Sequence, residues 1–183
     1  MSLALAARYS RALADLAFDP KHEVTPDALA EDLDRLLAEL EAYRPLREVL
    51  TSPAVPLGKK RAVVEKLCAQ QGFHALTRKF LCVVLDHRRV PLLRAIRDGF
   101  RRVVDERLGV APATVVSAVE LTLEERQMFA QRVEELTGKR PRCEFQVDPA
   151  ILGGAVLRLG SLVYDGSVRG RLQSLEAHLT RNV

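Results

Sequence analysis

The residues that could support catalysis or bind a metal are few and widely spaced. The chain has four histidines and three cysteines: His22, His74, His87, His178, Cys68, Cys82 and Cys143. No histidine adjoins a nucleophile or a second ligand in sequence, and no C-x-x-C pair is present, so neither a catalytic nor a zinc site is indicated. We expect His87 to lie at a helix end near carbonyl groups, and the cysteines to be buried reduced thiols. The sequence therefore predicts no enzyme active site and no cofactor.

A glycine-rich stretch near the end of the chain could instead bind phosphate. Residues 148–172 hold five of the ten glycines. However, neither G-x-G-x-x-G between a strand and a helix nor G-K-[ST] occurs there. Gly153-Gly154 precedes an expected strand, so no helix N-terminus points at an anion. A capped helix start at Ser167–Arg169 could attract an anion, but Asp165 already supplies a compatible charge. We therefore interpret these glycines as turn residues.

Three arginines could contact a phosphate backbone. Arg94, Arg97 and Arg101 are spaced by three and four residues, so they share one face of the helix expected after Pro91. Residues 51–108 carry 13 basic and 5 acidic side chains, although the net charge of the whole chain is only +4. No aromatic residue is interleaved on the arginine face, and no nucleic-acid motif accompanies it. Nucleic-acid binding remains an alternative to a protein contact or a solvated face, and Lys59-Lys60-Arg61 is expected to be solvated.

The first half of the chain has the pattern of a helical bundle with short connections. Helical periodicity predicts six helical segments: Leu3–Phe18, Pro26 to Arg44, Leu46–Leu50, Gly58 to Gln71, Phe73–His87, and Pro91 to Leu108. The first helix and the segment Phe80–Leu85 are more apolar than a one-sided surface helix requires. Part of their apolar surface is therefore expected either to be central in the bundle or to bind a partner.

The pattern changes after Gly109. Valine-rich Ala113–Val119 predicts a strand, the T-x-x-E capping box at Thr122 begins a helix, and Arg142–Val147 alternates as a strand. A hairpin of Ala155–Leu159 and Leu162–Tyr164 follows, with its turn at Gly160-Ser161. A final helix begins at Ser167 and carries Val168, Leu172, Leu175 and Leu179. We predict an α+β protein in which residues 1–108 form a six-helix bundle and residues 109–183 form a β-α-β-β-β-α domain.

Membrane insertion is not predicted. The longest apolar run, Phe80–Leu85, is far shorter than the roughly 20 residues that cross a bilayer. The N-terminus lacks a basic region followed by an apolar run and a cleavage site. The chain is therefore expected to be soluble and intracellular.

Several motifs, in order along nearly the whole chain, resemble one protein family. They are ARYSRAL at residues 7–13, LTSP at 50–53 followed by Lys59-Lys60, SAVELT at 117–122, DPAILGG at 148–154 and DGSVRGRL at 165–172. Together they are similar to the delta subunit of bacterial F-type ATP synthase, whose mitochondrial relative is the oligomycin-sensitivity-conferring protein. Ser10 departs from the alanine usual at that position, a mild change on a close-packed helix.

This resemblance implies a non-catalytic subunit of the peripheral stalk, or stator. The helical domain would bind the catalytic head, chiefly the N-terminal helix of one alpha subunit, and the second domain would bind the C-terminal ends of the b subunits. The subunit would hold the head against rotor torque at the cytoplasmic face of the bacterial inner membrane. It would reach the membrane only through the complex, and it would bind no nucleic acid.

The two over-apolar helices fit that role. A groove between the first and fifth helices would suit an amphipathic helix anchored at i, i+3, i+4 and i+7. The predicted partner-binding residues are Tyr9, Ala12, Leu13, Phe80, Val83 and Val84. The alternative role of each is the core of the bundle.

Overall fold

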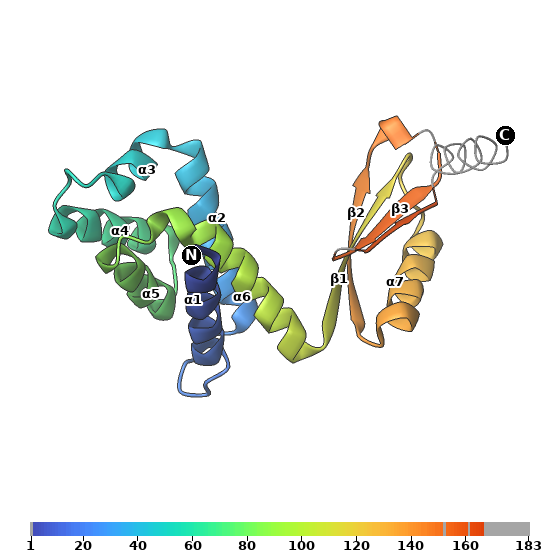
Figure 1. The fold of residues 1–183 in the computed structure, drawn as a ribbon, viewed down its shortest axis with the longest axis horizontal. Helices are drawn as coiled ribbons and strands as arrows, with labels where there is room; N and C mark the ends of the chain where they lie inside the picture. Colours follow the sequence, from blue (N-terminus) through green and yellow to red (C-terminus); the bar gives the residue numbers. More distant parts are fainter. Residues whose placement is uncertain (1, 152, 161, 167–183) are drawn as a thin grey trace, which may run out of the picture. The chain divides into compact units, whose positions relative to one another are not determined.

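The computed structural model describes residues 2–151, 153–160 and 162–166. Its elements are α1 (Ser2–Ala17), α2 (Pro26–Ala42), α3 (Arg44–Thr51), α4 (Leu57–Gln71), α5 (Ala75–Asp86), the 3₁₀ turn η1 (Val90–Leu92), α6 (Leu93–Leu108), β1 (Val110–Ser117), α7 (Leu123–Thr137), β2 (Arg140–Val147), η2 (Pro149–Ile151), β3 (Ala155–Leu159) and β4 (Leu162–Asp165) (Figure 1). The predicted α+β class is confirmed. The final helix predicted from Ser167 lies outside the described residues.

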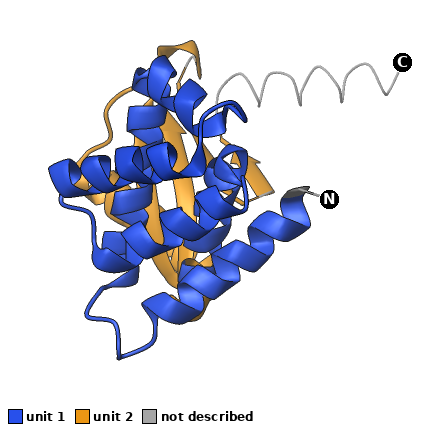
Figure 2. Ribbon diagram, turned by 90° about the vertical axis from the view of Figure 1, so that its left-hand side faces the viewer, with its two compact units in different colours: residues 1–104 blue, residues 105–183 orange. Residues whose placement is uncertain are grey.

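The chain forms two compact units, Met1–Val104 and Asp105–Val183, coloured separately in Figure 2. The division falls in the last turn of α6, a few residues before the predicted boundary between 108 and 109. Each unit has an apolar core of its own. In the described part of the chain, every helix is too short or too polar to cross a membrane.

Local capping determines where several helices begin and end. Thr25 Oγ1 accepts a hydrogen bond from Ala28 N at 3.2 Å, with Pro26 at the first helical position of α2. Gly72 ends α4 with φ of 67°, a conformation that glycine adopts without steric cost. The end of α5 differs, because Arg88 takes the left-handed position there with φ of 55°.

Helices α1 and α6 pack closely in the first unit. Ser10 is fully buried, and its hydroxyl lies 2.9 Å from Ala6 O within α1 and 2.7 Å from Ile96 O on α6. Because a hydroxyl group has a single hydrogen, its hydrogen bond is shared between the two carbonyl oxygens. Ser10 therefore makes a polar contact between two helices at a depth where alanine would make none.

The expectation of a solvated Lys59-Lys60-Arg61 face is wrong for Lys60 and incomplete for Arg61. Lys60 is buried, and its Nζ donates to Leu50 O at the end of α3 at 2.9 Å. Arg61 is exposed but makes two hydrogen bonds to Asp86, which link α4 to α5. Lys59 is exposed, as predicted. Sequence periodicity did not reveal these contacts because both partners come from other elements.

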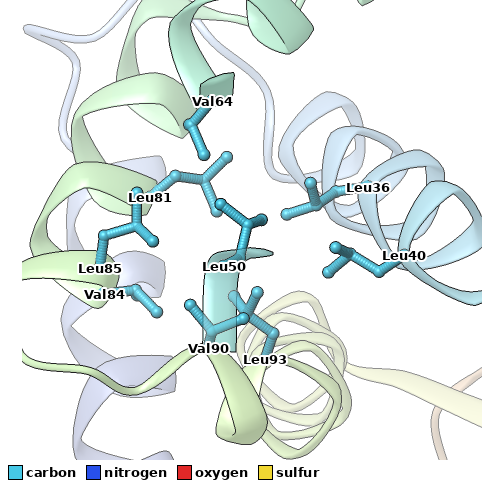
Figure 3. A pocket seen from close by; sticks show the side chains of 9 residues that line it. All are labelled: Leu36, Leu40, Leu50, Val64, Leu81, Val84, Leu85, Val90 and Leu93. Carbon is cyan, nitrogen blue, oxygen red and sulfur yellow. The ribbon is translucent and has the colours of Figure 1, made fainter. Parts of the chain in front are cut away.

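A small apolar cavity lies in the core of the first unit, between α2, α3, α4, α5 and the start of α6 (Figure 3). Its volume is about 10 Å³. The lining residues are Leu36, Leu40, Leu50, Val64, Leu81, Val84, Leu85, Val90 and Leu93. A space that just fits one water but offers it no polar partner stays empty, so we interpret the cavity as a packing defect.

In the described residues of the second unit, four strands form a sheet of order β2-β1-β3-β4, and α7 packs on one face of it. Strands β1 and β2 are parallel and connected through α7, whereas β1 with β3 and β3 with β4 are antiparallel. The predicted capping box is present, because Thr122 Oγ1 accepts from Glu125 N and Glu125 Oε2 accepts from Thr122 N. Val133 of α7 and Val115 of β1 are fully buried between helix and sheet.

Candidate protein-binding surface

The six predicted partner-binding residues lie on two helices that pack side by side. Tyr9, Ala12 and Leu13 belong to α1, and Phe80, Val83 and Val84 belong to α5 (Figure 1). The ring of Tyr9 meets the ring of Phe80 edge-on, with centroids 6.3 Å apart and an interplanar angle of 75°. Aromatic pairs favour this arrangement. The contact joins the two helices at the level where the prediction placed the site.

Burial separates the six residues into two groups. Leu13 and Val84 are 1% and 0% exposed and Phe80 is 8% exposed, so they belong to the core. Ala12 is exposed, Tyr9 is half-buried, and Val83 is 46% exposed. Direct contact with a partner is therefore available chiefly to Tyr9, Ala12 and Val83, and the buried Phe80 contacts Tyr9 from the core.

Two further residues on α1 extend the surface, and the sequence prediction missed them. Leu5 is half-buried and Leu16 is 38% exposed. Positions 5, 9, 12 and 16 follow the spacing of one helix face. The buried stripe of α1 (Ala6, Ser10, Leu13, Ala14, Ala17) lies on a neighbouring face, so α1 has two apolar stripes. The signal was present in the sequence as a second periodic series, which the abundance of alanine obscured. We call the exposed and half-buried residues Leu5, Tyr9, Ala12, Leu16 and Val83, together with the core residue Phe80 that Tyr9 contacts, the α1–α5 apolar surface.

A buried carboxylate on α2 positions the start of α5. Asp32 is fully buried, and its Oδ2 accepts hydrogen bonds from His74 N at 2.9 Å and from Thr77 Oγ1 at 2.7 Å. Arg35 pairs with the other carboxylate oxygen. Burial alone would raise the pKa of Asp32, but the hydrogen bonds from Thr77 and His74 outweigh it and hold this pKa below its usual value. Asp32 thus acts as an N-terminal cap supplied by another helix.

The arginine face of α6 is paired with carboxylates on α2. Arg94 pairs with Glu41. Both Arg97 and Arg101 reach Asp34, with Arg97 Nε 3.3 Å from Asp34 Oδ1. These pairs neutralise much of the positive face that a nucleic acid would need. Among the described residues, nothing favours the nucleic-acid alternative, and the three arginines act as links between two helices.

Chemically reactive residues do not gather in the described part of the chain. No group of three or more histidine, cysteine or acidic side chains there could hold a metal ion. His87 caps the end of α5, and its backbone N–H donates to Val83 O at 3.2 Å. All three cysteines are free, but only Cys68 is buried, whereas Cys82 and Cys143 are half-buried, which corrects that prediction. Burial raises the pKa of the Cys68 and Cys143 thiols, so neither is activated as a nucleophile.

Comparison with known proteins agrees with the motifs. The family model described as ATP synthase delta (OSCP) subunit matches residues 5–179. The chain belongs to this family. The resemblance predicted from the motifs is thereby confirmed, and with it the assignment of the chain as a peripheral-stalk subunit of an F-type ATP synthase.

Individual relatives match over nearly the full length of both chains. The ATP synthase subunit delta of Koribacter versatilis is 35% identical over 94% of this chain and 96% of its own. That of an Anaeromyxobacter species is 40% identical over 96% of each. Among solved structures, a chain of the Toxoplasma gondii mitochondrial ATP synthase hexamer matches 96% of this chain and 97% of its own, with a TM-score of 0.68 and 24% identity. At that identity the structural match supports the fold alone.

Proposed function

We propose that this stalk subunit is non-catalytic and links the catalytic head of ATP synthase to the C-terminal ends of the b subunits. Residues 1–108, as a six-helix bundle, bind the N-terminal helix of an alpha subunit. Residues 109–183, as a β-α-β-β-β-α domain, bind the b subunits. The protein acts at the cytoplasmic face of the bacterial inner membrane and contacts the membrane only through the complex.

The α1–α5 apolar surface is the observation that carries the alpha-subunit part of this proposal. From Leu5 to Leu16 it extends about 16 Å along α1, about three turns of helix. Val83 and Leu16 keep 46% and 38% of their surface exposed, whereas the next residues of the same helices, Val84 and Ala17, are buried in the core. An amphipathic helix that lies along two such helices buries its apolar face against theirs.

The contacts around this surface suit a part that transmits force and performs no chemistry. The Tyr9–Phe80 contact joins α1 to α5, the Ser10 hydroxyl joins α1 to α6, and Asp32 joins α2 to α5. Each contact links a helix of the surface to another helix of the first unit. A pull on a docked helix is therefore distributed over the unit.

The alpha-subunit site can be tested with the full chain and a peptide of the alpha-subunit N-terminal helix from the same organism. We expect amide shifts on both α1 and α5 in the nuclear magnetic resonance spectrum as the peptide saturates. Val83→Asp places a charge in the surface and is expected to weaken binding about tenfold or more.

A matched control is Val119→Asp, because Val119 is 69% exposed and lies in the second unit. It should bind the peptide like the wild type. Unchanged amide shifts on both helices at saturating peptide would refute the proposed site. For the second half of the proposal, a peptide from the C-terminal end of the b polypeptide should perturb residues 109–183 and leave α1 and α5 unchanged.

A further inference from the structure

We infer that the helix docking on the α1–α5 apolar surface carries carboxylates on both flanks of its apolar stripe. The inference rests on the proposed function and adds to it the charge pattern of the partner. It comes from two cations, Arg8 and Lys79, which border the surface on opposite sides.

Both cations are sequence neighbours of the two aromatic residues, Tyr9 and Phe80, that are in contact. Arg8 directly precedes Tyr9 and lies one turn before Ala12, which places it on the outer border of the α1 stripe. Lys79 directly precedes Phe80 and lies one turn before Val83, which places it on the outer border of the α5 contribution. Both side chains are exposed. A helix lying between these borders would therefore have a cation beside each flank.

Neither cation is neutralised by another described residue. Arg61, Arg94 and Arg101 all pair with carboxylates of neighbouring helices. No described carboxylate lies within ion-pair distance of Arg8 or Lys79, and both keep their charge for a partner. Asp15 follows Arg8 two turns later along α1, so the cationic border is confined to the middle of the surface.

Carboxylates at matching positions of the docked helix would complete two ion pairs at the edge of the interface. Pairs in such rim positions chiefly affect the association rate and its dependence on salt. Each exposed pair is worth a few-fold in affinity. Lysine or arginine at the same positions would be repelled, so the two cations also select against helices with basic flanks.

The test uses the full chain and the synthetic alpha-subunit N-terminal peptide, with affinity measured by fluorescence anisotropy at low and high salt. Arg8→Gln and Lys79→Gln should each weaken binding about two- to fivefold at low salt, and together by about the product of the two. Lys66→Gln is the matched control, because Lys66 is an exposed cation on α4, a helix that contributes no residue to the α1–α5 apolar surface. It should bind like the wild type.

A second peptide, in which the flanking Asp and Glu residues are replaced by Asn and Gln, completes the double-mutant cycle. It should bind the wild type more weakly and be insensitive to Arg8→Gln and Lys79→Gln. If these variants match Lys66→Gln while Val83→Asp abolishes binding, the surface is correct and the charge inference is overturned. If Val83→Asp also binds like the wild type, the docking site itself is wrong and both proposals fail.

Discussion

A Cβ atom added to Gly99 of α6 would lie 2.5 Å from Ser10 Oγ and 3.1 Å from Ser10 Cβ on α1. The backbones of α1 and α6 therefore approach so closely that only glycine fits at residue 99. The Ser10 hydroxyl occupies the space that a side chain there would need. Because its Oγ also bonds to Ile96 O, the serine cannot turn away without breaking a buried hydrogen bond.

Gly99→Ala is expected to lower the free energy of unfolding by about 1–3 kcal/mol, the usual cost of forcing an extra methyl group into a packed interior. Chemical denaturation of the full chain measures it. Gly58→Ala is the control, since nothing lies within 4 Å of a Cβ added at that helical glycine. Alanine favours helix by up to about 1 kcal/mol, so this variant should be slightly stabilised.

Ser10→Ala combined with Gly99→Ala tests the contact itself. Removing Oγ eliminates the 2.5 Å approach and leaves the 3.1 Å approach to Cβ. The double variant should therefore be less destabilised than the sum of the two single variants. Strict additivity would show that the two residues do not interfere.

Asp32→Asn should destabilise the first unit by about 1–3 kcal/mol at neutral pH, because charge-assisted hydrogen bonds to a buried group are lost. The pKa of Asp32 is lower in the folded chain than in the unfolded chain. Its stabilising contribution is therefore complete above pH ~4 and is lost as the pH falls through the folded-state pKa. Urea denaturation of the wild type and of Asp32→Asn across this pH range should show that the difference between their free energies of unfolding becomes smaller in acid. A difference that stays constant down to pH ~2 would contradict this account.

Arg88→Gly should raise the free energy of unfolding by up to about 1 kcal/mol, because an L-residue at a φ of 55° is strained and glycine is not. Arg89→Gly provides the comparison, since φ at Arg89 is −101°. That substitution should lower stability by a few tenths of a kcal/mol through the added freedom of the unfolded chain. Thermal melts of the two variants should move in opposite directions.

Lys60→Met should lower the free energy of unfolding by about 1–3 kcal/mol. The substitution removes Lys60 Nζ, which donates a hydrogen bond to the buried Leu50 carbonyl oxygen at 2.9 Å. Lys59→Met changes an exposed neighbour on the same turn and should stay within about 0.5 kcal/mol of the wild type. If both variants behave alike, the buried hydrogen bond contributes little.

Elements with local signals could be predicted from the sequence. The capping box at Thr122 lies where the sequence placed it, because its hydrogen bonds join residues only three positions apart. Boundaries without such signals shifted. Strand β1 begins at Val110 instead of Ala113, since pairing with β2 extends it through Pro112.

Contacts between distant segments could not be predicted. Asp32 and His74 are 42 positions apart, and Arg94 and Glu41 are 53 apart. In the sequence, each of these residues is recognisable only as part of a charged helix face. Their pairing depends on how the helices pack. For the same reason, periodicity found both helices of the candidate site but did not separate buried Leu13 from exposed Ala12 on adjacent positions of α1.

The second apolar stripe of α1 has a consequence for the free protein. Folding buries only one of the two apolar stripes of α1. The other stripe stays exposed to water until a helix of another protein covers it. Copies of the protein that are made in excess of their partners therefore expose an apolar stripe, and we expect them to self-associate as their concentration rises. Light scattering of the free chain should fall when the alpha-subunit peptide is added. Balanced synthesis of the subunits would then serve solubility as well as assembly.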